Sequence, residues 1–227
     1  MKSILKVAAL ASLLAVAGCA GTLKAPSANV DAAKLPMVKA ASANPPRSIL
    51  YVGNSFMYYN NSLHGITSRL ALGSVNGKEA NHRATSLTIS GSGIDWHDLE
   101  SYLRPDGLGR YSFVGDNEVR FNPPGRQYDS VILMDCSQCP IHPKLQAIFY
   151  EYAKKHSETL RKHGSEPILF MSWAYSDVPA MTEQLAVEYI KAGQQNNALV
   201  VPAGYAFANS VSKRPDVSLI IADKRHP

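Results

Sequence analysis

Short apolar segments alternate with helical patterns from residue 47 to the end of the chain, and this alternation constrains the fold more than any other feature. Strand-like runs occupy residues 48–52, 84–89, 130–134 and 168–172, and helical apolar faces occupy residues 63–70, 145–160 and 181–192. Strands that alternate with helices are typical of a parallel sheet covered by helices on both faces. We therefore predict an α/β protein, a three-layer α/β/α sandwich with a central parallel sheet.

Other segments are less decisive. Residues 95–103 are a short helix candidate, stopped by Pro105. Residues 105–127 are rich in Gly, Pro and Asn and are either a long irregular insertion or a loose hairpin. Residues 199–201 and 217–221 are either late strands or short helices. Trp96, Trp173 and Tyr175 are candidates to line a pocket, with packing as the commoner role of the two tryptophans. Tyr58 and Tyr59 follow Ser55 and are candidates for an apolar or sugar-stacking wall.

The first 18 residues have the pattern of an export signal. Lys2 and Lys6 precede an apolar segment, residues 7–16, that is too short to span a bilayer as a mature helix. The segment ends in Val16-Ala17-Gly18-Cys19, which resembles the cleavage site of bacterial lipoproteins. We predict that residues 1–18 are removed, and that acyl chains on Cys19 anchor the exported protein to a membrane of the bacterial envelope. The alternative is an ordinary secretory signal that happens to be followed by a cysteine.

Residues 19–46 are predicted to be a flexible tether. They are rich in Ala, Pro, Ser, Lys and Asn and cannot bury enough apolar surface to offset chain entropy. The folded domain is predicted to span residues 47–227. The net charge of +5 falls to +3 without Lys2 and Lys6, and no dense basic run is present. The sequence therefore gives no support for a nucleic-acid partner.

A serine follows the first predicted strand, in Gly53-Asn54-Ser55. It is either a turn residue or a nucleophile at the carboxyl end of a parallel strand, where open α/β sheets place their sites. A nucleophilic serine needs a neighbouring base. His226 is the best candidate, because Asp223 lies three residues before it and can orient the imidazole. The other six histidines are interpreted as surface or capping groups: His64, His82, His97, His142, His156 and His163.

These blocks occur in an order that resembles the SGNH (GDSL-like) hydrolases, within them the members with Gly-Asn-Ser-Phe in place of Gly-Asp-Ser. The resemblance covers residues 48–227 and implies a flavodoxin-like fold. It implies that Ser55 is the nucleophile, His226 the general base and Asp223 its orienting acid, with no cofactor. It also implies oxyanion-hole donors at the backbone N–H groups of Ser55 and Gly91, with Gly93 as the alternative to Gly91.

One block departs from the family pattern. The family's Gly-x-Asn-Asp segment would follow the strand at residues 130–134, but this chain has Asp135-Cys136-Ser137-Gln138-Cys139-Pro140. Gln138 is the candidate to replace the family's oxyanion-hole Asn, and Asn54 is expected to hold the serine turn. In an exported chain Cys136 and Cys139 are expected to form a disulfide, and no metal site is expected although His142 is near.

The expected function is hydrolysis of carboxylic esters, with short acyl groups on carbohydrate as the leading substrate class by family analogy. The alternative is a non-catalytic envelope protein of the same fold that binds glycan. Family members continue beyond the His-Pro of the last block with a final helix, which this domain is predicted to lack. We therefore expect His226 to be held only by Asp223 and residues 219–222, and turnover to be weak.

Overall fold

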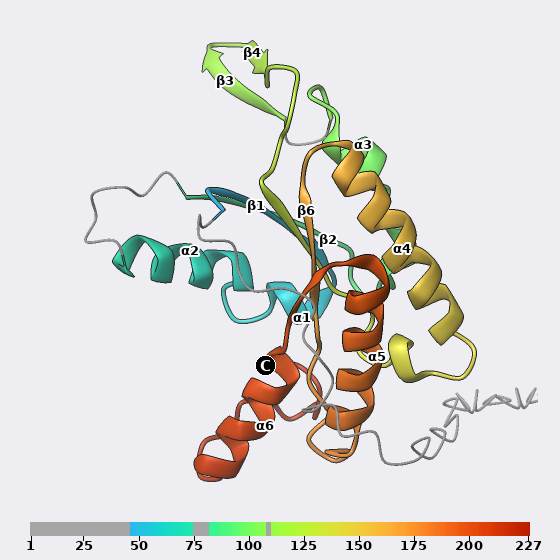
Figure 1. The fold of residues 1–227 in the computed structure, drawn as a ribbon. Coiled ribbons are helices and arrows are strands. Elements are labelled where there is room, and N and C mark those ends of the chain that lie inside the picture. The colour runs from blue at the N-terminus through green and yellow to red at the C-terminus, as the bar shows by residue number, and fades with distance from the viewer. Residues whose placement is uncertain (1–45, 75–81, 108–109) are drawn as a thin grey trace, which may run out of the picture.

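The computed structural model describes residues 46–74, 82–107 and 110–227, and its centre is a five-stranded parallel sheet (Figure 1). The strand order is β2-β1-β5-β6-β7, and every neighbouring pair is parallel. The strands are β1 (Ser48–Gly53), β2 (Arg83–Thr88), β5 (Ser130–Leu133), β6 (Glu166–Phe170) and β7 (Leu199–Val201). Because the strands are parallel, all their carboxyl ends meet at one edge of the sheet.

Helices cover both faces of the sheet, so the predicted three-layer sandwich is confirmed. Side chains alternate along β1, so Leu50 and Val52 join a core with α3 (Leu99–Leu103), α4 (Gln146–Lys162) and α5 (Met181–Asn196). Ile49 and Tyr51 face the opposite layer, which contains α1 (Ser55–Tyr58), α2 (Leu63–Ser74) and α6 (Ala203–Lys213). Figure 1 shows α3, α4 and α5 on one side of the sheet and α2 on the other.

Several segments that the sequence left open now have an assignment. Residues 105–127 contain an antiparallel hairpin, β3 (Tyr111–Gly115) and β4 (Glu118–Phe121). Residues 199–201 form the edge strand β7, whereas residues 217–221 form neither strand nor helix. The predicted helix at residues 95–103 is divided into the 3-10 turn η2 (Ile94–Trp96) and α3, because the Asp98 side chain caps α3 by accepting from Ser101 N at 3.3 Å. The helix α6 was not predicted.

The predicted signal segment, residues 1–18, and the lipid attachment site Cys19 lie outside the described residues, as does the tether up to residue 45. These assignments stay predictions. In the part of the chain that the structure describes, every helix is too short or too polar to cross a bilayer.

Candidate active site

The serine turn lies at the carboxyl edge of the sheet, where β1 passes directly into α1. Gly53 has no room for a side chain, since a Cβ there would lie 2.9 Å from Met57 Sδ and 3.2 Å from Met134 Cβ. Asn54 then caps α1, and its Oδ1 accepts from Phe56 N at 3.1 Å. Ser55 is therefore the first residue of α1 and is partly exposed at the sheet edge.

Ser55, His226 and Asp223 lie in one hydrogen-bonded line, although 171 residues separate the serine from the histidine. The Ser55 Oγ is 2.8 Å from His226 Nε2, and His226 Nδ1 is 2.5 Å from Asp223 Oδ2. The Asp223 carboxylate also accepts from the backbone N–H groups of Arg225 and His226, both at 2.9 Å. The His226 side-chain bond and these backbone bonds lower the pKa of Asp223 to about 2, so this carboxyl is ionised at neutral pH.

His226 has more supports than the sequence led us to expect, and the expectation that only Asp223 and residues 219–222 hold it is wrong. The Tyr59 ring stacks on its imidazole, with 4.2 Å between centroids and 16° between planes. The Phe56 ring meets it edge-on at 5.1 Å. Trp173 Nε1 donates to Arg225 O at 2.8 Å, which fixes the neighbouring backbone. The imidazole is thus enclosed by aromatic rings that come from the serine helix and the residue after it.

A buried polar layer lies directly beneath Ser55. Asn54 is 4% exposed, and its Nδ2 donates to Ser92 O at 3.0 Å and to Asp135 O at 3.1 Å. Asn54 therefore joins the carboxyl ends of three neighbouring strands, and its predicted role in holding the turn is confirmed. Asp135 Oδ1 accepts from Ile94 N at 2.8 Å and Cys136 N at 2.7 Å. Burial nevertheless raises the pKa of Asp135 to about 6, because desolvation disfavours the charged form.

Two histidines interpreted from the sequence as surface or capping groups are in fact buried. His97 is 3% exposed, and its ring nitrogens lie 3.2 Å from Ser92 Oγ and 3.3 Å from Tyr102 Oη. His156 is 2% exposed and donates from Nε2 to Ile94 O at 2.9 Å. Burial lowers the pKa of both, that of His97 to about 4. An isolated histidine in a polar stretch gave no signal of this, because the burying elements come from distant parts of the chain.

Two of the predicted oxyanion-hole donors, Ser55 and Gly91, lie in neighbouring segments. The turn that carries Gly91 lies beside α1, since Ile89 N donates to Gly53 O at 3.0 Å and Tyr58 Oη to Ser90 Oγ at 3.1 Å. Gly91 has a φ of +71°, which favours glycine. Among the described residues, no acceptor binds the Ser55 or Gly91 N–H. Gln138 immediately precedes η3 (Cys139–Ile141), and its side-chain amide makes no hydrogen bond to any described residue.

The loop after β5 is closed by a disulfide between Cys136 and Cys139, with their Cα atoms 5.2 Å apart. Ligand atoms of Asp135 and these two cysteines lie within 4.8 Å of one another. In the disulfide form the two sulfurs are not thiolates, so this group does not have the ligands that a zinc site requires. Ser137 Oγ lies 2.6 Å from Tyr175 Oη, which connects the loop to the segment after β6.

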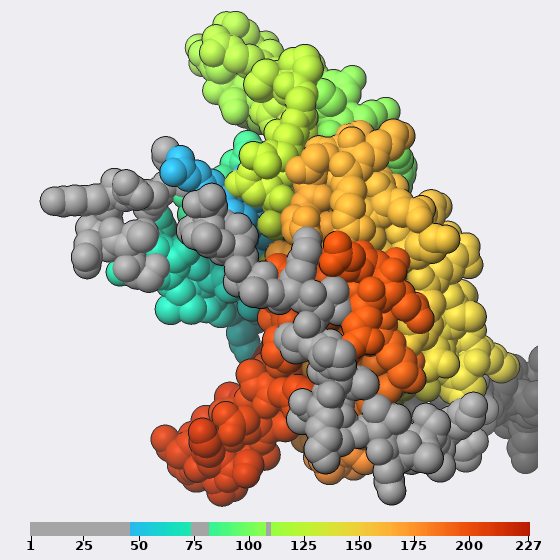
Figure 2. All heavy atoms as spheres, in the orientation of Figure 1, coloured from blue at the N-terminus to red at the C-terminus, as the bar shows by residue number. Residues whose placement is uncertain are grey.

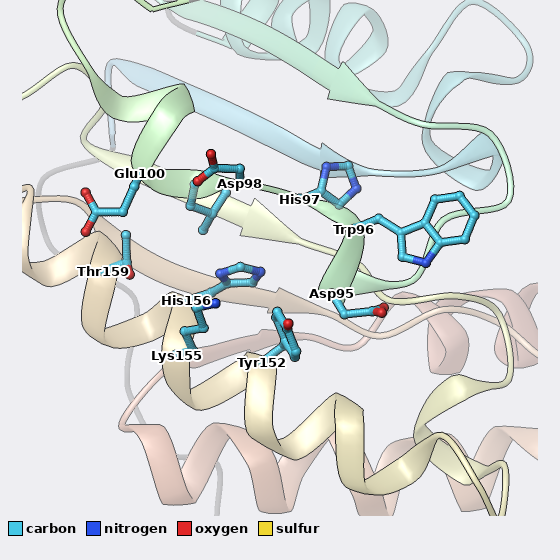
Figure 3. A pocket seen from close by; sticks show the side chains of 10 residues that line it. Asp95, Trp96, His97, Asp98, Glu100, Tyr152, Lys155, His156 and Thr159 are labelled. Atoms are coloured by element: carbon cyan, nitrogen blue, oxygen red, sulfur yellow. The ribbon is translucent and has the colours of Figure 1, made fainter.

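A cavity of about 200 Å³ opens between α4 and the segment that contains η2 and α3 (Figure 3). Trp96 lines it together with Tyr152, His156 and three carboxylates, those of Asp95, Asp98 and Glu100. Trp96 is 60% exposed, so of its two interpretations the structure supports the pocket-lining one. Trp173 is 3% exposed and does pack, between Phe56 and Phe207.

Comparison with known proteins establishes the fold. No family model matches the chain, and no curated protein is significantly similar in sequence. A candidate SGNH hydrolase from Slackia heliotrinireducens superposes with a TM-score of 0.56 at 17% identity, covering 81% of this chain and 91% of its own. TesA gives 0.54 at 14% identity, covering 79% and 88%. A variant of Axe2, an acetyl xylan esterase from Geobacillus stearothermophilus, gives 0.52 at 14% identity, covering 80% and 87%. The chain therefore has the fold of the SGNH hydrolases.

Proposed function

We propose that this protein is an SGNH-type serine hydrolase of carboxylic esters. The observation that carries the proposal is the line from Ser55 Oγ through His226 to Asp223, with distances of 2.8 Å and 2.5 Å. This arrangement lets a weak nucleophile lose its proton as it attacks. The shared fold of known SGNH esterases supports the same reaction class.

In the proposed reaction the tautomer of His226 follows from its partners. Nδ1 carries the proton and donates a hydrogen bond to the ionised Asp223, so Nε2 has the lone pair that accepts the Ser55 proton. Ser55 Oγ attacks the acyl carbon, and the imidazolium then gives the proton to the leaving alcohol. Water, deprotonated by the same Nε2, attacks the acyl-enzyme, and the imidazolium returns the proton to Ser55 Oγ as the acyl–oxygen bond breaks and the acid leaves. The N–H groups of Ser55 and Gly91 and the Gln138 amide are the proposed donors to the oxyanion.

The proposed substrates are short acyl esters of carbohydrate in the bacterial envelope, where the protein would be held by acyl chains on Cys19. Tyr58 and Tyr59 support this substrate class, because both rings are over a third exposed and lie next to the catalytic line. Exposed aromatic rings offer flat apolar faces on which a sugar ring can stack. An acetyl xylan esterase among the proteins of this fold is in keeping with an acetyl group.

The competing proposal is a glycan-binding protein without turnover. It is favoured by Gln138, which stands where the family has Asn and has an amide on a longer stem. Against it, a protein that only binds has no need for an imidazole hydrogen-bonded to both a serine and a carboxylate.

The deciding experiment measures hydrolysis of p-nitrophenyl acetate by the purified protein and by Ser55→Ala. We expect kcat/KM to fall by at least about 10³-fold, because removing a triad member disables the group. Ser212→Ala, in an exposed serine of α6, is the matched control and should keep full activity. Equal turnover in Ser55→Ala and the parent would overturn the nucleophile. Absence of turnover in the parent, on acetate esters and acetylated oligosaccharides alike, would favour the binding protein.

A further inference from the structure

The hairpin β3–β4 exposes an apolar face that nothing in the described residues covers. Tyr111 pairs with Phe121 and Phe113 with Val119, so all four side chains lie on one face. Their exposed fractions are 44%, 56%, 74% and 41%, in that order. The Tyr111 ring contacts those of Phe113 and Phe121, with centroids 5.7 Å and 6.2 Å apart. We call these four residues the hairpin face.

The hairpin projects from the other described elements. Figure 2 shows the hairpin projecting beyond the sheet and helices, and Figure 1 shows it at the end of the sheet opposite α1. A two-stranded hairpin with an exposed apolar face is only marginally stable in water. An exposed apolar face of this kind is typical of a site that contacts another protein or a membrane.

The chain enters the folded domain at the base of this hairpin. The N–H groups of Arg47 and Ser48 donate to Asp129 Oδ2 at 2.7 Å and 3.0 Å, and Asp129 lies between the hairpin and the first residue of β5. Gln127 connects the same base, since its carbonyl accepts from Arg83 and its Oε1 from Asn122. The first described residues therefore lie at the hairpin's end of the sheet, and this is where the predicted tether, residues 19–46, would join the domain. Ser55 lies at the other end of β1, roughly 20 Å away for six extended residues.

The exposed area of the hairpin face favours a membrane surface over a second copy of the chain as its partner. Its aromatic side chains expose on the order of 350 Å², taking about 200 Å² for each whole ring. A stable protein interface buries about 800 Å² on each partner. This face alone is therefore too small to hold a second copy of the chain in a stable dimer. A membrane surface makes a smaller demand, because the proposed lipid anchor already keeps the domain beside it and raises its effective concentration there.

We propose that the hairpin face inserts into the interfacial region of the membrane to which the lipidated Cys19 is proposed to anchor the protein. Tyr and Phe are suited to this region, since their rings leave water while the hairpin backbone stays among hydrated headgroups. The inference rests on the proposed anchor and is independent of the proposed hydrolysis. Its consequence is an orientation: Ser55 faces away from the bilayer, so the substrate approaches from the aqueous side.

The test places a tryptophan reporter on the lipidated full chain in vesicles of phosphatidylethanolamine and phosphatidylglycerol that contain brominated phosphatidylcholine. Phe113→Trp should report insertion, with its added emission quenched by roughly half because interfacial burial reaches the upper acyl chains. Leu70→Trp is the matched control, because Leu70 is 68% exposed but lies on α2. Its added emission should match that in vesicles without bromine. The emission of Trp96 and Trp173 is subtracted using the parent protein.

Each other outcome overturns the inference. An unquenched Phe113→Trp means that the hairpin face stays in water. A dimer in detergent that Phe113→Ser converts to monomer would assign the face to a second copy. An N-terminal peptide whose mass lacks acyl chains would remove the anchor on which the inference rests. Hydrolysis of p-nitrophenyl acetate, measured in the same samples, separates these failures from failure of the proposed function.

Discussion

The candidate site has two layers that differ in exposure and in the way they are held. The side chains of Asp223 and His226 are 39% and 19% exposed, whereas Asn54 and Asp135 beneath them are 4% and 2% exposed. The upper layer comes from a terminal segment without regular structure, and the lower layer from the ends of the central strands. The comparison indicates that the proposed base and its orienting carboxylate are accessible to solvent, whereas buried side chains hydrogen-bonded to the backbone hold the turn that presents Ser55.

The largest effect that separates the layers is expected from Asp223→Asn. The amide carries no negative charge and can donate its own N–H to Nδ1, so the imidazole loses the partner that sets its tautomer and stabilises the imidazolium. We expect kcat for p-nitrophenyl acetate to fall by about 10²-fold or more, and the midpoint of thermal unfolding to stay unchanged. Calorimetry on the same sample is the check. A large loss of stability would mean that the upper layer also supports the fold.

The lower layer should give the opposite pattern. Asn54→Ala leaves the carbonyls of Ser92 and Asp135 without a donor and Phe56 N without an acceptor. Unsatisfied buried polar groups cost about 1–3 kcal/mol each, and partial rescue by water reduces the sum, so we expect a loss of roughly 2–3 kcal/mol in unfolding free energy. Urea denaturation measures it, with Asn209→Ala in an exposed position of α6 as the control. Full stability in Asn54→Ala would show that this layer is not what holds the turn.

The sequence predicted the upper layer better than the lower one. Ser55 follows a recognisable strand, and Asp223 and His226 are three residues apart, so local patterns identify them. Asn54 was singled out because it stands beside the serine. His97 and His156 were misjudged, because burial depends on α3 and α4 packing over the sheet, which single positions do not reveal. The aromatic enclosure of His226 joins residues 56, 59 and 173 and could not be read from any one segment.

The pH dependence of stability offers a finer test of the lower layer. The Asp135 pKa is raised to about 6, so between about pH 4 and 6 the folded state keeps a proton that the unfolded chain has lost. The contribution of this carboxyl to the unfolding free energy therefore falls by about 1.4 kcal/mol per pH unit as the pH rises through that range. His97, with its pKa lowered to about 4, acts in the opposite direction, since only the unfolded chain is protonated between about pH 4 and 6.5.

Asp135→Asn removes the first effect and leaves the second. Its unfolding free energy should therefore rise more steeply with pH than that of the parent between pH 4.5 and 6. His97→Gln should change the slope in the other direction. Urea denaturation at these two pH values measures both. Identical slopes in Asp135→Asn and the parent would mean that this carboxyl titrates alike in the folded and unfolded states.

The smallest expected effect concerns Tyr59, which belongs to neither layer but lies flat against the His226 ring. Aromatic stacking of this kind is worth about 1 kcal/mol, so Tyr59→Ala should lower kcat by roughly fivefold through a less well positioned base. Tyr58→Ala is the matched control, because Tyr58 is as exposed as Tyr59 but stacks on that ring and not on the imidazole. Tyr59→Phe keeps the ring and should restore kcat. If Tyr58→Ala and Tyr59→Ala lower kcat equally, or if Tyr59→Ala changes only KM, the ring serves substrate binding, and the proposed base is held by Asp223 and the backbone of its own segment.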